Sequence, residues 1–193
     1  YNSLGQFERA ALALKEAVRI DPKNAGAFTN LGLAHFGLGE FAQSVTDLSE
    51  AIRLAPGNAL LHYNRAGAYA RRGMVDDAIR DYDEAIRRAP RFAEAYVGLA
   101  RVLENQGQRG KAIEGYDMAL RLGPLDAGLY CDRGNAKRAE GDWNGAIDDF
   151  TRALQINPRH SQAYVSRGWS LFISGREGAE GDARLYLDLN PDG

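Results

Sequence analysis

Cysteine, histidine and long apolar runs are all scarce in this sequence of 193 residues. The single cysteine, Cys131, cannot form an internal disulfide, which argues against a disulfide-stapled secreted fold and favours the cytoplasm, although a secreted helical protein is not excluded. No apolar run approaches the roughly 18 residues of a membrane-spanning helix, so we expect no membrane insertion. The chain begins at Tyr1, inside a repeat, which indicates a fragment and leaves any signal peptide undetermined.

An excess of charge of one sign is also missing. The chain has 24 Lys and Arg against 26 Asp and Glu, giving a formal net charge of -2. A nucleic-acid-binding protein needs a basic excess to contact phosphates, so we expect no nucleic-acid partner. The hydrophobic content of 45% and the charged content of 26% are typical of a soluble, folded chain.

Glycine and proline, in contrast, recur with one shared period. Glycine returns every 34 residues, at Gly5, Gly39, Gly73, Gly107, Gly141 and Gly175. Proline returns at the same interval, and then one residue early, at Pro22, Pro56, Pro90, Pro124, Pro158 and Pro191. This self-similarity is typical of a repeat array. We predict a single array over 1–193, with a partial unit 1–24, full units 25–58, 59–92, 93–126 and 127–160, and a last unit 161–193 that is one residue short.

Each unit is predicted to contain two helices. Apolar and small residues recur at helical spacing on both sides of the glycine, and small residues stand opposite large ones so that antiparallel helices can pack closely. The glycine suits the end of the first helix, and the proline stops the second. The predicted fold class is therefore all-α, an α-solenoid of antiparallel helix pairs with 34-residue repeats and no strands. Below, the place of a residue is its position within its unit.

The repeated motif resembles the tetratricopeptide repeat. The pattern is aromatic-x-x-L/R-G/A-x-x-Y, then G, then A-I-x-x-Y-x-x-A-I/L, then P, and it is clearest in Tyr63 to Pro90, Tyr96 to Pro124 and Tyr130 to Pro158. The resemblance covers essentially the whole chain. It implies a right-handed superhelix whose first helices line a concave groove, which family members commonly use to bind an extended peptide or a helix of a partner. The chain departs from the motif at Arg109, Lys137 and Glu177.

A charged pair recurs within three units. The seventh place, usually apolar, carries an arginine in units three, five and six, and the twenty-third place of the same units carries an aspartate. The three pairs are Arg65 with Asp81, Arg133 with Asp149, and Arg167 with Asp182. Because a planar guanidinium suits a partly buried bidentate contact, we predict that each pair joins the two helices of its unit, or helices of adjoining units. A ligand-binding role for these arginines is the alternative.

No catalytic pattern is found. His35 and His62 stand where the repeat requires an aromatic side chain, which favours core packing over metal binding, and no histidine pair has metal-helix spacing. Cys131 has no C-x-x-C partner, but it falls on a groove-facing place, which leaves an incidental reactive thiol open. We therefore predict a protein that is not an enzyme, with no catalytic, cofactor-binding or metal site.

The resemblance also implies which residues face a partner. The second, fifth, sixth, ninth, twelfth and thirteenth places of each first helix would line the groove. The candidate partner-binding residues are Asn30, Leu33, Phe36, Tyr63, Asn64, Arg71, Val97, Arg101, Asn105, Asp132, Asn135, Arg138, Trp169 and Phe172. Of the positions that the family uses to clamp the acidic C-terminus of a chaperone, only Asn64 matches, so we do not expect that binding mode.

The sequence predicts a non-catalytic scaffold for protein–protein interaction that binds a peptide or partner protein in its concave groove. Two alternatives stay open. The array could be the partner-recruiting arm of a larger enzyme, such as a glycosyltransferase or kinase. It could instead be a module for end-to-end self-association, because the helices at both ends expose a stacking face.

Overall fold

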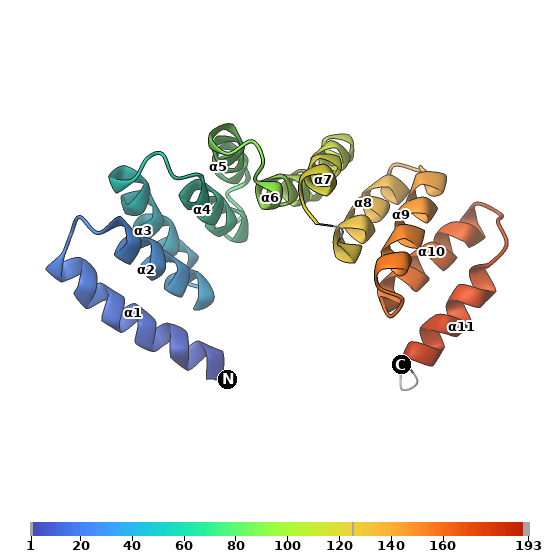
Figure 1. Ribbon diagram of the computed structural model, residues 1–193, viewed down its shortest axis with the longest axis horizontal. Helices are drawn as coiled ribbons and strands as arrows, with labels where there is room; N and C mark the ends of the chain where they lie inside the picture. Colours follow the sequence, from blue (N-terminus) through green and yellow to red (C-terminus); the bar gives the residue numbers. More distant parts are fainter. Residues whose placement is uncertain (1, 125, 191–193) are drawn as a thin grey trace. The chain divides into compact units, whose positions relative to one another are not determined.

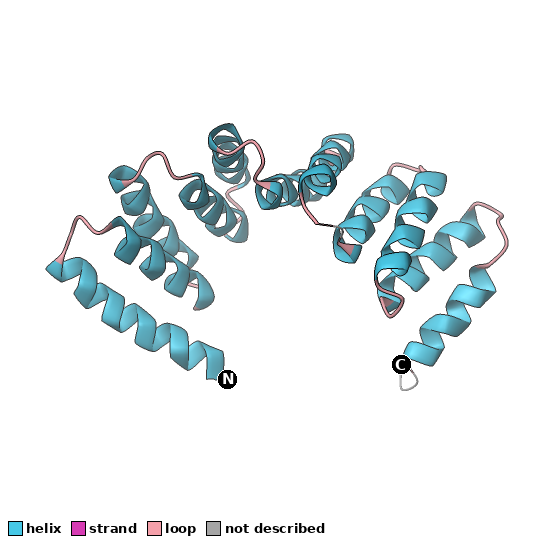
Figure 2. Ribbon diagram, viewed as in Figure 1, coloured by secondary structure: helices cyan, strands magenta, loops and turns pink. Residues whose placement is uncertain are grey.

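The computed structural model describes residues 2–124 and 126–190 and falls into two compact units, Tyr1–Val102 and Leu103–Gly193, which are described separately. The described residues form eleven helices and no strand (Figures 1 and 2), which confirms the all-α prediction. The first unit contains α1 (Asn2–Ile20), α2 (Ala25–Gly37), α3 (Phe41–Leu54), α4 (Ala59–Arg71) and α5 (Val75–Arg88). The helix α6 (Ala93–Asn105) spans the boundary. The second unit contains α7 (Arg109–Leu122), α8 (Ala127–Ala139), α9 (Trp143–Ile156), α10 (Ser161–Ile173) and α11 (Ala179–Leu189).

Within each unit, every helix packs against the next one along the chain, from α1 to α5 and from α7 to α11 (Figure 1). In chain order, the predicted repeats correspond to the successive helices α2 and α3, α4 and α5, α6 and α7, α8 and α9, and α10 and α11, preceded by α1 as a second helix without its own first helix. The solenoid of helix pairs is thus confirmed. The single array over 1–193 stays a prediction, because each unit is described by itself.

Glycines in the left-handed conformation form the turns within the repeats, as predicted. Their φ angles lie between +67° and +85°, a region that a side chain disfavours. These five residues are Gly39, Gly73, Gly107, Gly141 and Gly175. The shortened last repeat has a second left-handed glycine, Gly178 with φ of +106°, directly before α11. The place of the deletion, between Gly175 and Ala179, is therefore a turn of altered geometry.

The prediction is wrong for Gly5, which lies inside the continuous helix α1 and not at a turn. Only four residues of this chain precede it. They are too few for a separate helix, because the formation of the first helical turn is unfavourable in free energy. The prolines fit the prediction: each described one follows its helix by two residues, as Pro56 follows Leu54. Pro191 and Tyr1 lie outside the described residues.

Large and small side chains interlock between the helices of a pair. In four of the repeats the twenty-fourth place carries a large, buried side chain, namely Leu48, Tyr82, Tyr116 or Phe150. Glycine on the facing first helix makes room for it: a Cβ on Gly32 would lie 2.7 Å from Leu48, and one on Gly134 would lie 2.8 Å from Phe150. The close approach predicted from small residues opposite large ones is confirmed, and these contacts form much of the core.

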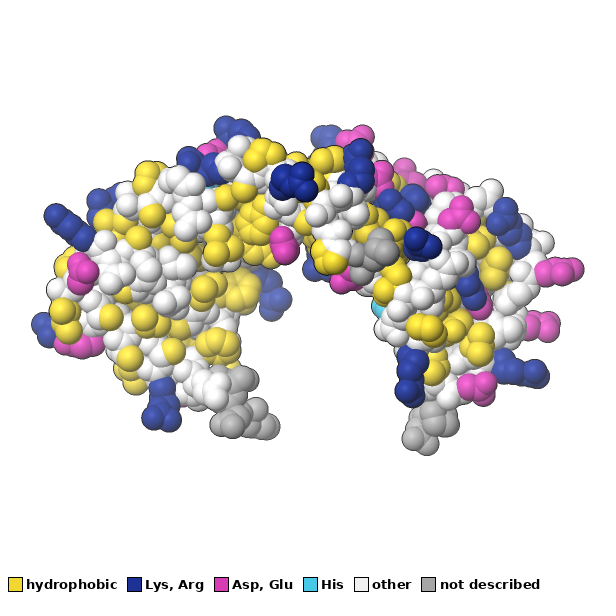
Figure 3. Space-filling view, in the orientation of Figure 1, with side chains coloured by type: hydrophobic (Ala, Val, Ile, Leu, Met, Phe, Trp, Pro, Cys, Tyr) yellow, Lys and Arg dark blue, Asp and Glu magenta, His cyan; other side chains and the backbone are white. Residues whose placement is uncertain are grey.

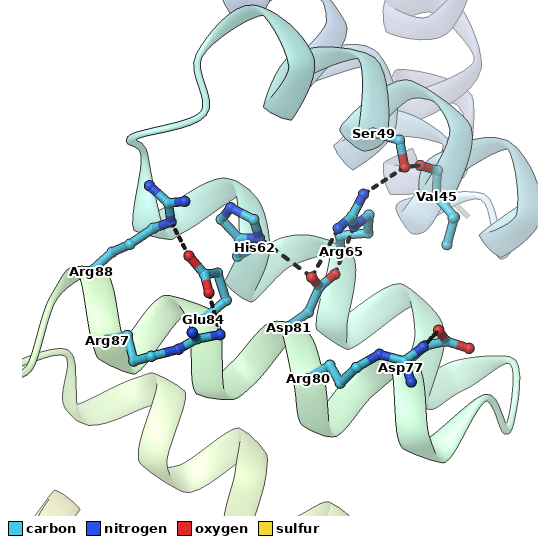
Figure 4. Close-up of polar contacts among 10 residues, drawn as sticks. All are labelled: Val45, Ser49, His62, Arg65, Asp77, Arg80, Asp81, Glu84, Arg87 and Arg88. Carbon is cyan, nitrogen blue, oxygen red and sulfur yellow. Dashed lines mark hydrogen bonds and ion pairs between the residues drawn. The ribbon is translucent and has the colours of Figure 1, made fainter.

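The predicted arginine–aspartate pairs are present, and each arginine also reaches a third helix. Arg65 of α4 donates to Asp81 of α5 from Nε to Oδ2 at 2.6 Å and from Nη2 to Oδ1 at 2.9 Å. Its Nη1 donates to Ser49 Oγ of α3 at 2.9 Å (Figure 4). One guanidinium therefore joins both helices of its own repeat to the second helix of the preceding repeat. We call this arrangement an arginine brace.

Both other pairs form the same brace in the second unit. Arg133 of α8 donates to Asp149 of α9 at 2.9 and 2.5 Å and to Asp117 of α7 at 2.6 Å. Arg167 of α10 donates to Asp182 of α11 at 2.8 and 2.6 Å and to Thr151 of α9 at 3.2 Å. The third acceptor occupies the twenty-fifth place of the preceding repeat each time. The arginines hold the stack together, so their structural role is confirmed.

Other nitrogen-bearing side chains reach the aspartate at the twenty-third place. His35 Nδ1 lies 2.6 Å from Asp47 Oδ2 in the second repeat, which has Leu31 instead of an arginine at the seventh place. Lys137, one of the departures from the motif, lies 3.0 Å from Asp149. His35 and His62 are buried, as predicted, and His62 Nδ1 lies 3.3 Å from Asp81 (Figure 4). The departure at Lys137 thus adds an ion pair to the core, because the buried carboxylate provides its partner.

Removing one carboxylate of a brace tests its contribution to stability. Asp149 is 3% exposed and accepts from Arg133 and Lys137, so the substitution Asp149→Ala leaves two cations without their buried partner. We expect a loss of about 3 kcal/mol in the free energy of unfolding. The neighbouring substitution Asp148→Ala, at an exposed position, should change it by less than about 0.5 kcal/mol. Urea denaturation, followed by circular dichroism, compares the stability of the two variants. Equal midpoints would contradict the role of the brace.

Replacing two of the periodic glycines by alanine should change the stability of the chain in opposite directions. Gly39→Ala places a side chain at φ of +78°, which costs about 1–2 kcal/mol. Gly5→Ala lies inside α1 with no atom within 4 Å of the new Cβ, so it should stabilise by about 0.5–1 kcal/mol. Thermal unfolding of both variants measures the difference. A shift of the two midpoints in the same direction would show that Gly5 is not helical.

Candidate binding surface

Three of the first helices that carry candidate residues, α2, α4 and α8, begin at a side-chain cap. The side chain of Asn24 accepts from the backbone N–H of Ala27 before α2, and that of Asp126 accepts from Leu129 before α8. Asn58 caps α4 in the same way. The sequence analysis missed these caps, although Asn or Asp directly before a first helix is the expected signal. They fix where these three helices start, and hence which side chains share their exposed faces.

None of the fourteen candidate residues is buried. The first unit holds Asn30, Leu33, Phe36, Tyr63, Asn64, Arg71, Val97 and Arg101. The second unit holds Asn105, Asp132, Asn135, Arg138, Trp169 and Phe172. That they act together in binding stays a prediction. The structure shows which of them meet within one unit.

In the first unit, Phe41 connects two of the candidates. Its ring meets the ring of Phe36 edge-on, with 5.3 Å between the centroids, and the guanidinium of Arg71 lies 5.3 Å from its centroid. Phe36 and Arg71 therefore border one aromatic patch that joins α2, α3 and α4. Phe41 belongs to a second helix, so the place rule for first helices could not select it.

Tyr63 is partly a structural residue. Its ring lies 5.9 Å from that of Tyr82 and 4.9 Å from that of Phe92, centroid to centroid, and it is half-buried. Burial raises the pKa of Tyr63, and it raises the pKa of Tyr82 to about 12. Both phenols therefore stay neutral at physiological pH. Tyr63 contributes to the core of its repeat and has only part of its surface left for a partner.

In the second unit, the structure brings Arg138 and Trp169 to one cavity of about 510 Å³. We call it the end hollow; its walls come from α8, α10 and α11, and it is lined by Arg138, Gln162, Tyr164, Val165, Ser166, Gly168, Trp169, Ala179, Ala183, Tyr186 and Leu187. Trp169 is 53% exposed, and its ring lies 6.0 Å from that of Phe172. These exposed aromatic side chains make this the most apolar candidate surface of the second unit.

Several residues of the end hollow were not among the candidates. Val165, Tyr186 and Leu187 line it, the last two from a second helix. A signal was present in the sequence: the twenty-fourth place is Ala183 instead of a large residue, and the twenty-seventh is Tyr186 instead of alanine. The motif alone did not reveal that this exchange opens a cavity, because the consequence depends on how α11 packs.

Cys131 does not face a groove, contrary to its place in the repeat. It is buried, within a core cluster that includes Phe150 and Ala153. Burial, together with the nearby carboxylates of Asp132 and Asp126, raises the pKa of this thiol to about 11. The suggestion of an incidentally reactive thiol is therefore wrong, because the thiolate is the reactive form and hardly exists near neutral pH.

The described part of the chain contains no group of three or more His, Cys, Asp or Glu that could hold a metal ion. The same residues include no helix that is long and apolar enough to cross a membrane. On the face shown in Figure 3, basic and acidic side chains are interspersed over the helices, without a patch of one sign. The geometry is that of a helical-repeat scaffold, with rigid helices that carry exposed aromatic and polar side chains.

The comparisons with known families agree with this description. Tetratricopeptide repeat profiles match residues 29–79 and 63–127 in one case and 127–160 in another, and a TPR repeat profile matches residues 1–39. The chain belongs to the tetratricopeptide repeat family. No curated protein sequence matches it.

Solved structures share its fold. YrrB, described as a TPR protein with an unusual peptide-binding site, aligns with a TM-score of 0.78 and 21% identity over 94% of each chain. The C-terminal part of a TPR repeat-containing protein from Cytophaga hutchinsonii aligns with a TM-score of 0.83 and 14% identity, over 95% of this chain and 74% of that one. MamA from Desulfovibrio magneticus RS-1 aligns with a TM-score of 0.76 and 18% identity, over 86% and 92%. At these identities the likeness shows the fold.

The burial of Cys131 predicts slow chemistry at its thiol. With the pKa raised to about 11, the native chain should react with a thiol-specific disulfide reagent about a hundredfold more slowly, or slower still, than the unfolded chain in guanidinium at the same pH of about 8. The release of the reagent's coloured thiolate measures both rates. Similar rates in the two states would mean that Cys131 is accessible on the surface after all.

Proposed function

We propose that this chain is a non-catalytic interaction scaffold whose first helices present side chains to a peptide or a partner protein. The observation that supports this proposal best is the exposure of Trp169 and Phe172 on α10, at the ninth and twelfth places of a first helix. The exposure of a large aromatic side chain to water is unfavourable, and aromatic residues are enriched among those that contribute most to binding. The repeat fold is itself a scaffold, and the described residues show no catalytic domain.

The arginine braces support the same proposal. Arg167 fixes α10 to α11 and α9 through Asp182 and Thr151, so the exposed aromatic side chains stand on a rigid helix. A surface held in one arrangement loses less conformational entropy on binding than a flexible one. The similarity to YrrB, whose description mentions a peptide-binding site, points to the same class of partner. The near balance of charge remains our reason for proposing no nucleic-acid partner.

A peptide selection followed by substitution tests this function. Random dodecapeptides displayed on phage are selected on the immobilised 193-residue chain, and enriched peptides are synthesised with a fluorescent label. The triple substitution Asn64→Ala, Arg101→Ala and Asn135→Ala removes predicted contacts on first helices. We expect it to weaken binding at least about tenfold, measured by fluorescence anisotropy.

The matched control changes three exposed arginines on second helices, Arg53→Ala, Arg80→Ala and Arg152→Ala. It should alter the affinity by less than about twofold. Equal losses in the two triple variants would show that the peptide does not bind on the first helices. Failure to enrich any peptide would contradict peptide binding altogether, and concentration-dependent light scattering in that case would favour self-association.

A further inference from the structure

The end hollow exists because the last repeat lacks the side chain that fills the same space in the other repeats. In repeats two to five, the twenty-fourth place holds Leu48, Tyr82, Tyr116 or Phe150, all of which are buried. In the last repeat that place is Ala183, which is exposed and lines the hollow. The volume of about 510 Å³ lies within the range of ~300–1,000 Å³ that is typical of ligand pockets.

The wall opposite Ala183 still has the form that accepts a large side chain. Gly134 and Gly32 at the eighth place lie close against Phe150 and Leu48, and Gly168 keeps glycine at this place in the last unit. The three atoms nearest to a Cβ on Gly168 belong to Asp182 and Ala179 and not to a large apolar side chain, and Gly168 lines the hollow. The last repeat thus combines the glycine of a filled site with an alanine at the place of the side chain that fills it.

The twenty-seventh place distinguishes this end from the other repeats. It holds alanine in all five preceding repeats, as at Ala153, which shares a core cluster with Ala163 of the next first helix. Here it is Tyr186, which lines the hollow. A further helix packed in the manner of the other repeats would meet this larger side chain at the place where alanine permits their close approach. The hollow is therefore not shaped for another repeat helix.

Arg138 supplies the polar chemistry of the hollow. Its Nε is buried without a hydrogen-bond acceptor, and among the described residues its guanidinium has one hydrogen bond, from Nη2 to Asn135 Oδ1 at 3.4 Å. A buried donor of this kind is unfavourable unless an acceptor arrives. A packed helix satisfies its own backbone carbonyls and offers little to such a donor, whereas a carboxylate fits a guanidinium in both charge and shape.

We propose that the end hollow binds a peptide of a partner protein through a large apolar side chain, Phe, Tyr or Leu, that lies next to an acidic residue. The apolar side chain fills the space in front of Gly168 and Ala183, between Trp169 and Tyr186. The carboxylate of its neighbour accepts from Arg138. This proposal rests on the proposed function, and it assigns both a place and a ligand chemistry to it.

The test uses the peptides enriched by the selection described above, with the chain in a Trp143→Phe background so that Trp169 is the only tryptophan. We expect an aromatic residue or leucine beside Asp or Glu in the enriched sequences, and a change in Trp169 fluorescence on binding. The substitution Ala183→Phe restores the missing ring and should weaken binding at least about tenfold. Its matched control Ala183→Ser keeps the hollow open and should change the affinity less than about twofold.

The charge is tested separately. Arg138→Gln and Arg138→Glu should weaken binding at least about tenfold, and the charge reversal should weaken it more than the neutral change. For a peptide whose acidic residue is replaced by its amide, neither substitution should change the affinity. Helical circular dichroism confirms folding of each variant, and if one Arg138 variant fails to fold, the other and Ala183→Phe keep the test decisive.

Three outcomes would overturn the proposal, and they are distinguishable. If enriched peptides bind Ala183→Phe and Arg138→Glu as well as the parent chain, peptide binding stands but occurs elsewhere. If no peptide is enriched, the proposed function fails together with the hollow. If the chain self-associates in light scattering and Ala183→Phe abolishes this, the occupant is a second copy of the chain.

Discussion

The contact on which this stack of helices depends is the arginine brace. A single guanidinium of a first helix binds a buried aspartate of its own repeat and an oxygen of the preceding one, as Arg133 binds Asp149 and Asp117. Apolar packing alone would let neighbouring helices slide against each other, since burial is not directional. The fork of hydrogen bonds is directional, so it fixes the register of three helices at once.

This rigidity connects the fold to the proposed function. The three braces lie between the helices of their repeats, while the exposed face of a first helix is left to side chains such as Trp169. The last repeat keeps its brace through Arg167 and Asp182 but gives up the large side chain at the twenty-fourth place. Stability and binding thus depend on different places of the same repeat, because α10 keeps its contact with α11 without a large side chain at the twenty-fourth place.

Most of the fold could be predicted from the sequence, because the information is local and repeated. The positive φ of Gly73 and the helix stop before Pro90 follow from the conformational limits of single residues, and the period shows that they recur. The pairing of Arg65 with Asp81 was also predictable, since helical spacing places the seventh and twenty-third residues on facing helices. The prediction failed at Gly5, where the period continues but too few residues precede it for a first helix.

The candidate surface was predictable only in part. The resemblance to the repeat family placed Arg138, Trp169 and Cys131 on the groove-facing side of first helices. Cys131 is nevertheless buried, because burial depends on the neighbouring helices as well as on the face. By itself, the sequence determined the repeat, its turns and its arginine–aspartate pairs, which arise from local conformation and charge pairing. Only the tertiary structure decided that Ala183, Gly168 and Tyr186 enclose a hollow at Arg138, because a cavity is a property of three helices packed together.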